Sequence, residues 1–418
     1  MVYVIGRTGK PLMPCKNVIA RLLLKQGKAK VKKRNPFTIK LLYDTTDYTQ
    51  NLTLGIDTGS AHIGSAVSNA QGNIYYMAEI EIHNDITKKM TRRASYRRDR
   101  RSRKTRYRPA RWRNRANSIK KNRFSPTMRS KLQSHVKEIE YVKSITPITR
   151  LVLETGNFDP HLMKNPEMNR HWGYQKGLNY GFANTKAKVL DRDSHQCQHC
   201  KTTKGTMEVH HIVFRSQGGS DKEDNLITLC HDCHYKLHHS GLKLKLKGQR
   251  KGQLKHATQM NTIRCQLLRI YPEAIETFGY VTKENRQKAG LSKEHYNDAV
   301  MIASEGKEPK FQSNMVYQKK CVTKGDYQQT KGVRSEMVIP RNKIRGFLKF
   351  DKVKYLGKEY FIKGRYSTGY AILMDISGQK ISFKDMPKGW KTPKLVNMKR
   401  LEARSSWIIS PQIIQSII

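Results

Sequence analysis

The stretch that decides the fold reads Cys-Gln-His-Cys at 197–200, Val-His-His-Ile at 209–212 and Asn-Leu-Ile-Thr-Leu-Cys-His-Asp-Cys-His at 225–234. Each Cys-x-x-Cys pair presents two thiolates from a tight turn, and one Zn²⁺ ion can bridge two such pairs. The 29 residues between the pairs exceed the usual spacing of a zinc ribbon, so that loop must house something else. The predicted ligands of one structural Zn²⁺ are Cys197, Cys200, Cys230 and Cys233.

The loop between the cysteine pairs carries histidines in a pattern suited to phosphodiester cleavage. His210 and His234 are predicted to hold a divalent cation, and His238, one helical turn beyond His234, is left open as a further ligand. His211 is then free to deprotonate water as a general base, while Asn225 braces the loop that aims it. A purely structural zinc ribbon would explain the cysteines but not these other side chains.

A second set of candidate residues is scattered outside this block. Asp57 and Glu154 each end an apolar, strand-like run, and His295 and Asp298 lie three apart in a predicted helix, on one face of it. Taken singly, each acid has an ordinary explanation as a turn, strand-end or helix-face charge. Three carboxylates that converge need cations, and two Mg²⁺ ions about 4 Å apart are the usual solution in phosphodiester cleavage. His295 is then predicted to activate the attacking water.

The charge of the chain points to a polyanionic partner. Lys and Arg number 81 against 33 Asp and Glu, a formal charge of +48 over 418 residues. Nucleic acid is the expected partner, because this charge would repel itself in a compact fold. The run 88–115 holds fifteen cations and one acid and predicts a long basic helix up to Pro109, with a solvated face or a basic tail as the alternative. Its predicted nucleic-acid contacts are Arg92, Arg93, Arg97, Arg98, Arg101, Arg103, Arg106 and Arg108.

The distribution of apolar and polar residues along the chain indicates where the protein is found and which segments fold. No run reaches the roughly 20 apolar residues of a membrane span, and the first residues lack the apolar core of a secretory signal, so we expect a cytoplasmic protein without membrane contact. Strand-like runs at 52–56, 63–67, 74–82 and 150–154 predict folded domains. The stretch 305–340 is expected to be a polar loop, and 341–390 a small β-barrel.

Two sets of motifs resemble known nuclease domains. Val189-Leu190-x-Arg192-Asp193-x-x-x-Cys197-x-x-Cys200, Val209-His210-His211-Ile212 and Asn225-Leu226-x-x-Leu229-Cys230-x-x-Cys233-His234 resemble an HNH endonuclease domain with a ββα-metal core. The acids at 57, 154 and 298 with His295 resemble the three parts of a RuvC-like nuclease of the RNase H fold, divided by an arginine-rich helix and by the HNH domain. With Pro11-Leu12-Met13-Pro14 in front, this order resembles the IscB family, transposon-associated RNA-guided nucleases related to Cas9-class effectors.

The resemblance implies a multidomain chain of mixed α/β and α+β class, with a split RNase H-like core, an inserted HNH domain, a bridge helix, a small N-terminal module and a β-barrel-like C-terminal domain. It further implies a monomer bound to a long guide RNA that cuts a duplex DNA target beside a short flanking motif. The HNH site would cut the guide-paired strand and the RuvC-like site the displaced one. The alternatives are a guide-free HNH nuclease or junction resolvase, and a non-catalytic basic RNA-binding protein. The implied ranges are an N-terminal module 1–48, RuvC-like part I 49–86, bridge helix 87–118, RuvC-like part II 119–175, HNH domain 176–248, RuvC-like part III 249–310 and C-terminal domain 311–418.

Overall fold

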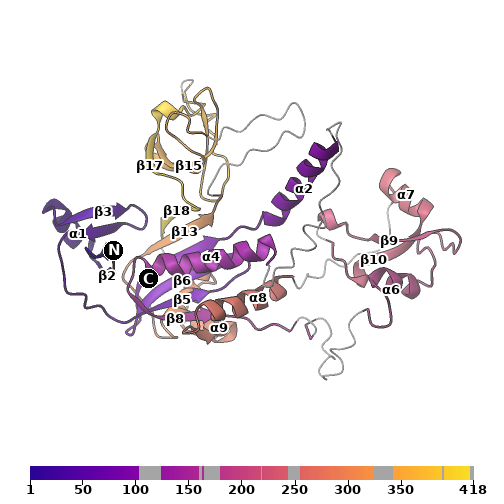
Figure 1. The fold of residues 1–418 in the computed structure, drawn as a ribbon, viewed down its shortest axis with the longest axis horizontal. Coiled ribbons are helices and arrows are strands. Elements are labelled where there is room, and N and C mark those ends of the chain that lie inside the picture. Colours follow the sequence, from indigo (N-terminus) through magenta and orange to yellow (C-terminus); the bar gives the residue numbers. More distant parts are fainter. Residues whose placement is uncertain are drawn as a thin grey trace. The chain divides into compact units, whose positions relative to one another are not determined.

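A computed structural model describes residues 1–102, 124–159, 162–163, 179–217, 219–242, 255–323, 342–387 and 390–414. The chain divides into two compact units. The first joins Met1–Asn157 to Gln259–Ile418, and the second is Phe158–Thr258. Each unit has a hydrophobic core of its own. The helices and strands of the chain are labelled in Figure 1.

An eight-stranded sheet forms the centre of the first unit. The strand order is β11-β8-β5-β6-β7-β13-β18, and β12 also pairs with β7. Strands β5, β6 and β7 form the expected antiparallel meander, whereas β8 runs parallel to β5 and β11 parallel to β8. The strands are β5 (Leu52–Asp57), β6 (His62–Asn69), β7 (Asn73–Glu81), β8 (Ile148–Glu154), β11 (Ile275–Thr277), β12 (Lys310–Phe311), β13 (Met315–Cys321) and β18 (Trp407–Ile413).

Helices pack on both faces of this sheet. Helices α4 (Pro126–Lys143) and α8 (Lys255–Ile270) bury their apolar faces on one side, where Ile139 and Ile263 join the same core as Leu54. Helix α10 (His295–Ala303) packs on the other side against β5 and β6. Because side chains alternate along a strand, Leu54 faces one helical layer and Gly55 the other.

Two glycines allow α10 to lie directly on the sheet. A Cβ atom at Gly55 would lie 2.4 Å from the backbone nitrogen of Ala303, and one at Gly64 would lie 1.9 Å from the carbonyl oxygen of His295. Real Cβ atoms do not approach other atoms so closely, so any larger residue would push the helix away. The position of α10 therefore depends on glycine at these two strand positions.

The stretch 305–340 is not the polar loop that the sequence predicts, because its described part contains β12 and β13. Strand β13 pairs in parallel with β7 and antiparallel with β18. The lysines of β13 make the segment look polar in sequence, but the side chain of Lys319 is fully buried. Its Nζ atom lies 2.7 Å from Oε2 of the equally buried Glu138. A buried lysine that has found a carboxylate cannot be told from a surface lysine in sequence alone.

Two smaller sheets flank the central one within the first unit. The N-terminal sheet has the order β2-β1-β4-β3 and carries helix α1 (Asn17–Lys25). The C-terminal sheet has the order β16-β15-β14-β17 and its own core. Their strands are β1 (Val2–Ile5), β2 (Pro11–Cys15), β3 (Ala29–Lys33), β4 (Thr38–Leu41), β14 (Lys352–Tyr355), β15 (Lys358–Arg365), β16 (Ala371–Met374) and β17 (Lys399–Glu402), with a 3₁₀ turn η3 at Leu395–Asn397.

The C-terminal region differs from its prediction in two ways. Its described strands form a sheet with β16 and β17 at the two edges, where the sequence predicts a barrel. Strands β13 and β18 lie in the predicted range 311–418 but extend the central sheet, so this range is not a body separate from the core. Short runs of apolar residues separated by glycine turns predict strands. Whether those strands close into a barrel depends on which of them pair, and this pairing is set by long-range contacts.

Two further helices of the first unit lie outside these layers. Helix α2 (Ile86–Ser102) follows β7, and helix α9 (Gly279–Lys288) lies between β11 and α10. Within the described part of the chain, none of the helices has the length and apolar character needed to span a bilayer.

The second unit is a small ββα arrangement with one helix before it. Strands β9 (Met207–His211) and β10 (Leu226–Cys230) pair antiparallel, and α7 (His231–His239) follows β10 directly. Helix α6 (Thr185–Arg192) precedes them, and 3₁₀ turns η1 (Arg215–Gln217) and η2 (Glu223–Asn225) lie in the connection. The core is small and includes Cys197, Cys230 and Cys233 beside Ile227 and Leu229.

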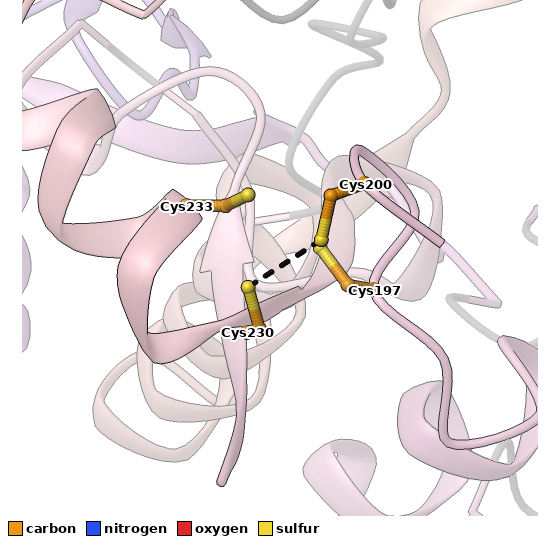
Figure 2. Close-up of side chains that lie close together, drawn as sticks. All are labelled: Cys197, Cys200, Cys230 and Cys233. Carbon is orange, nitrogen blue, oxygen red and sulfur yellow. Dashed lines mark hydrogen bonds between the residues drawn. The ribbon is translucent and has the colours of Figure 1, made fainter. Parts of the chain in front are cut away.

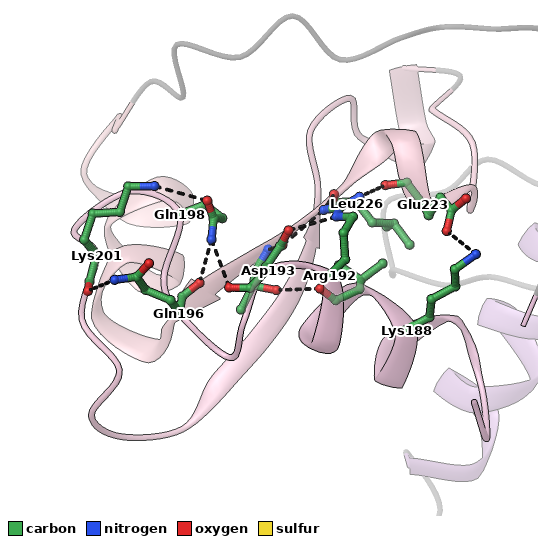
Figure 3. A network of polar contacts seen from close by, with 10 residues as sticks. Lys188, Arg192, Asp193, Gln196, Gln198, Lys201, Glu223 and Leu226 are labelled. Atoms are coloured by element: carbon green, nitrogen blue, oxygen red, sulfur yellow. Dashed lines mark hydrogen bonds and ion pairs between the residues drawn. The ribbon is translucent and has the colours of Figure 1, made fainter. Parts of the chain in front are cut away.

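A polar network attaches α6 to the end of this hairpin (Figure 3). Arg192 donates from Nη1 to the carbonyl of Glu223 at 2.6 Å and from Nη2 to that of Leu226 at 2.8 Å. Asp193 accepts from the backbone N–H of Thr228 at 2.9 Å and pairs with Arg192. Arg192 and Asp193, the pair quoted for the HNH resemblance, therefore connect the end of α6 to η2 and to β10.

Candidate active sites

Two acids predicted to act together lie at the ends of neighbouring parallel strands. Asp57 is the last residue of β5, Glu154 the last of β8, and the two are direct partners in the strand register. The Oγ1 atom of Thr58 donates to the carbonyl of Glu154 at 2.6 Å, which ties the turn after β5 to the end of β8. The carboxyl ends of parallel strands meet at one edge, so apolar runs far apart in sequence bring both carboxylates together.

Helix α10 brings the other two predicted residues to the same place. His295 lies in its first turn, and its Nδ1 atom is 2.6 Å from Oδ2 of Asp57. Asp298, one helical turn later, interacts electrostatically with both Asp57 and Glu154. All four residues predicted for the carboxylate site are therefore assembled, and the glycine contacts under α10 allow this approach.

The electrostatics of this site favour bound cations. Burial, followed by the charge of Asp57, raises the pKa of Glu154 to about 7. The same two causes raise the pKa of Asp298. Oε2 of Glu154 is buried, and none of the described residues supplies it with a hydrogen bond. Carboxylate oxygens are the ligands that Mg²⁺ prefers, and the buried Oε2 atom of Glu154 is available to such an ion.

Three neighbours of this site carry no signal in the sequence. The Nε atom of Arg286 lies 2.7 Å from Oδ1 of Asp298 and forms an ion pair with it. The ring of His62 stacks on that of His295 with centroids 5.4 Å apart and an interplanar angle of 5°. Gly279 leaves room for Glu154, because a Cβ atom there would lie 3.0 Å from Oε1. No motif of the sequence singles out Arg286, His62 or Gly279.

In the second unit, three histidines form a compact cluster. The imidazoles of His210, His234 and His238 each offer a nitrogen within 4.8 Å of the others. Nε2 of His210 lies 3.2 Å from Nε2 of His238, and Nδ1 of His234 lies 2.5 Å from Oε2 of Glu208. The geometry thus adds His238 to the two predicted ligands, and Glu208, which the sequence did not single out, orients His234.

His210 is held as a neutral imidazole. Burial, followed by the charges of His234, His238 and His211, lowers its pKa to about 4. Its Nδ1 atom is buried, and no hydrogen-bond partner for it exists among the described residues. A neutral imidazole has one lone pair to give to a metal ion, and His210 lies among two further imidazoles, so the three histidines together fit a divalent cation.

The other two residues predicted for this site, His211 and Asn225, lie on the segments that surround the cluster. His211 ends β9, and its Nε2 atom lies 2.8 Å from Oδ1 of Asp221. Asn225 is fully buried; its amide nitrogen donates to the carbonyls of Val213 at 3.0 Å and Ser220 at 2.8 Å. Asn225 therefore closes the loop that follows His211. Asp221 was missed in sequence because an exposed acid in a loop has no distinguishing pattern.

The four predicted zinc ligands meet at one point (Figure 2). The Sγ atoms of Cys197, Cys200, Cys230 and Cys233 all lie within 4.8 Å of one another, and those of Cys200 and Cys230 are 3.6 Å apart. A tetrahedral site with Zn–S bonds of about 2.3 Å separates its sulfurs by about 3.8 Å. The donor set and its spacing therefore fit one Zn²⁺ ion.

The predicted nucleic-acid contacts are partly within the described residues. Arg92, Arg93 and Arg98 are exposed on α2, and Arg97 is half-buried there. Arg101 belongs to the same helix. Arg103, Arg106 and Arg108 lie outside the described residues.

Comparison with protein families identifies two segments. Residues 2–177 match the family described as RRXRR protein, and residues 197–240 match the HNH endonuclease family. The second match contains both the cysteine and the histidine clusters. The first match contains Asp57, Glu154 and the whole basic run.

Individual relatives match over short stretches. Anaredoxin from Nostoc sp. is 33% identical over 67 residues, 16% of this chain and 88% of that protein. The type IV methyl-directed restriction enzyme EcoKMcrA of Escherichia coli is 35% identical over 63 residues, 13% of this chain and 23% of that protein. The probable mobile endonuclease C of Enterobacteria phage T4 is 51% identical over 39 residues, 9% of this chain and 19% of that protein.

A solved structure, the type II-C Cas9 enzyme from Actinomyces naeslundii, aligns over 62% of this chain and 60% of its own with 11% identity. Its TM-score is 0.21, too low to establish a shared fold. The match to the HNH endonuclease family and the similarity to two endonucleases indicate the class of enzyme instead. This chain is a DNA endonuclease of the HNH class, in which an RRXRR segment precedes the HNH domain.

Proposed function

We propose that this protein is an RNA-guided DNA endonuclease that cuts the two strands of a duplex at two separate sites. The observation that carries the proposal is the presence of two distinct clusters in one chain. One consists of carboxylates around Asp57, and the other of histidines around His210. A single active site would need only one of them, whereas two cutters suit the two strands of a duplex.

The carboxylate cluster is proposed as the RuvC-like site. The core order, three antiparallel strands followed by two parallel ones with β5 in the middle, supports an RNase H-like core split as the resemblance implies. Asp57, Glu154 and Asp298 would hold Mg²⁺, which when bound polarises the phosphate and neutralises developing charge. Because Nδ1 of His295 faces Asp57, its Nε2 is the nitrogen that accepts a proton from water.

The histidine cluster is proposed as the HNH site. His210 and His234, with His238 beside them, would hold a divalent cation at this site. His211 accepts a proton from the attacking water, and Asn225 holds the loop that follows it. The four cysteines would hold Zn²⁺ as a structural ion, away from the reacting atoms.

Charge supports a nucleic-acid guide and target. The formal charge of +48 favours a polyanionic partner, and exposed arginines of α2 suit bidentate phosphate contacts. Guide pairing would select the target, with the HNH site cutting the guide-paired strand and the RuvC-like site the displaced one. The proposed partition keeps 1–48 as the N-terminal module, 49–86, 119–175 and 249–310 as the RuvC-like parts, 87–118 as the bridge helix, 176–248 as the HNH domain and 311–418 as a region that contacts RNA and the flanking motif.

The deciding experiment begins with the RNA that copurifies with the full chain expressed from its native locus. That RNA is sequenced, and the complex is incubated in Mg²⁺ with plasmids carrying or lacking the sequence complementary to its variable part. We expect a double-strand break only in the matching plasmid. Cutting that ignores the complementary sequence, or that persists after the RNA is removed by ribonuclease, contradicts the proposal.

A guide-free nuclease is the second candidate. It is favoured by the names of two relatives, a restriction enzyme and a mobile endonuclease, which match short stretches of this chain. The same plasmid assay separates the two candidates. A guide-free enzyme would cut both plasmids equally and would retain that activity after ribonuclease treatment.

A further inference from the structure

We infer that Asp221 is a positioning residue that aims the His211 imidazole at the attacking water. This inference rests on the proposed function of the HNH site, and it adds a residue that no motif of the chain marks. Nε2 of His211 lies 2.8 Å from Oδ1 of Asp221. The same Oδ1 atom accepts a hydrogen bond from Nε of Arg215 at 2.7 Å.

The loop that carries Asp221 is held in place from inside the unit. The buried amide of Asn225 accepts from the backbone N–H of Val213 at 2.9 Å and donates to the carbonyl of Ser220 at 2.8 Å. A Cβ atom at Gly219 would lie 1.8 Å from the carbonyl oxygen of Val213, so glycine is required at this crossing. Asp221 directly follows Ser220, and its carboxylate is therefore presented to His211 by a fixed backbone.

The contact selects one tautomer of His211. A carboxylate only accepts, so the hydrogen bond places a proton on Nε2 and leaves the lone pair on Nδ1. Water then gives a proton to Nδ1 as its oxygen forms a bond to phosphorus. The P–O bond to the leaving oxygen breaks, that oxygen takes a proton from solvent, and the proton on Nδ1 returns to solvent. Asp221 stays ionised throughout, and its part is to hold the imidazole in this tautomer and orientation.

A role in stability does not account for this arrangement. The Asp221 side chain is 68% exposed, and exposed ion pairs contribute little to the free energy of folding. Its hydrogen bonds with His211 and Arg215 lower the pKa of the Asp221 carboxyl, so it is charged at neutral pH. A charged acceptor that adds little stability but restrains a general base is expected to act on the rate of the chemical step.

The test compares Asp221→Ala and Asp221→Asn with the parent protein in its guide RNA complex. The measurement is the single-turnover rate of cutting each strand of a matched duplex, with target affinity and melting temperature measured alongside. Asp224→Ala removes an exposed acid three residues away and serves as the matched control. We expect Asp221→Ala to slow guide-paired strand cutting about 10- to 100-fold, the cost of misorienting a catalytic group. Displaced-strand cutting and target affinity should stay unchanged.

Asp221→Asn should recover most of the rate. His211 and Arg215 both donate to the same oxygen, so the amide oxygen fits there, and a flipped amide would place its NH₂ group against two donors. Parental cutting by Asp221→Ala overturns the inference and leaves the proposed function standing, as does an equal loss in both variants. A parent complex that cuts no guide-paired strand overturns the proposed function, and the inference fails with it.

Discussion

Asp57 and Glu154, 97 residues apart in the chain, are direct register partners at the carboxyl ends of two adjacent parallel strands. A parallel pair needs a long connection, and this one contains the basic helix α2 and helix α4. The chain therefore inserts its most basic segment between two acids of one site. A nucleic acid bound along α2 would neutralise part of the positive charge of this helix.

Replacing Asp57 is expected to stop one of the two cuts. Asp57→Asn removes a charged oxygen ligand and should lower displaced-strand cutting by more than about 100-fold, since even outer-shell changes at metal sites cost 10- to 100-fold. Guide-paired strand cutting should continue, and strand-resolved gels report both. Asp47→Asn, at an exposed acid paired with Lys10, is the control. Double-strand breaks made by Asp57→Asn at the parental rate would refute the carboxylate site.

Replacing His211 is expected to give the complementary nickase. His211→Ala removes the general base and should lower guide-paired strand cutting by about 10²- to 10⁴-fold. Strand-specific labels measure the rate, and the displaced strand should be cut normally. His239→Ala changes an exposed histidine of α7 and should behave as the parent does. Loss of both cuts in His211→Ala would indicate that the two clusters do not act independently.

Zinc content is expected to depend on the buried cysteines. Elemental analysis of protein purified without chelator should find one zinc per chain, and Cys233→Ser should lose it. The HNH unit should then be destabilised, because its core is small and contains three of the ligands. Guide-paired strand cutting should fall while RNA binding persists. Cys265→Ser, at an exposed cysteine of α8, is the control and should retain zinc.

Stability of the first unit is expected to fall below neutral pH because of His135. Burial lowers the pKa of this histidine to about 4 from its usual 6.5, so the unfolded chain binds the proton more readily than the folded one. The stabilisation is complete above pH 6.5 and is lost as pH falls toward 4, by up to about 3 kcal/mol. His135→Asn, which can still donate to the carbonyl of Lys131, should flatten this dependence in denaturant titrations between pH 5 and 7.5. A parental slope in His135→Asn would contradict this.

The buried pair Lys319 and Glu138 is expected to be sensitive to loss of one partner. Lys319→Met leaves the Glu138 carboxylate buried without its cation and should lower the free energy of unfolding by about 3–5 kcal/mol. The double variant Lys319→Met, Glu138→Leu should recover much of that loss, because no uncompensated charge remains. Urea titrations of the three proteins provide the measurement. Additive losses in the double variant would show that the pair is not coupled.

Long apolar runs made much of the central sheet predictable. Strands β5, β6, β7 and β8 lie close to the ranges expected from the sequence, and helix α10 contains His295 and Asp298 as expected. Strand β13 was not predictable, because its buried lysine resembles a surface residue until Glu138 is packed against it. The strands of the C-terminal sheet were predictable, but its open edges were not, because the sequence of a short strand does not specify which other strand it pairs with.

The amino-acid sequence shows the chemical groups that the chain can use: two cysteine pairs, clustered histidines, separated acids and a large excess of cations. These signals are local, because ligand spacing, strand-end acids and charge density are readable within a few residues. Only the tertiary structure decided that Arg286 pairs with Asp298, that His62 stacks on His295 and that Asp221 meets His211. Such contacts join surfaces of different elements, so they depend on how closely helices and loops approach, and here glycines at 55, 64 and 219 set that approach.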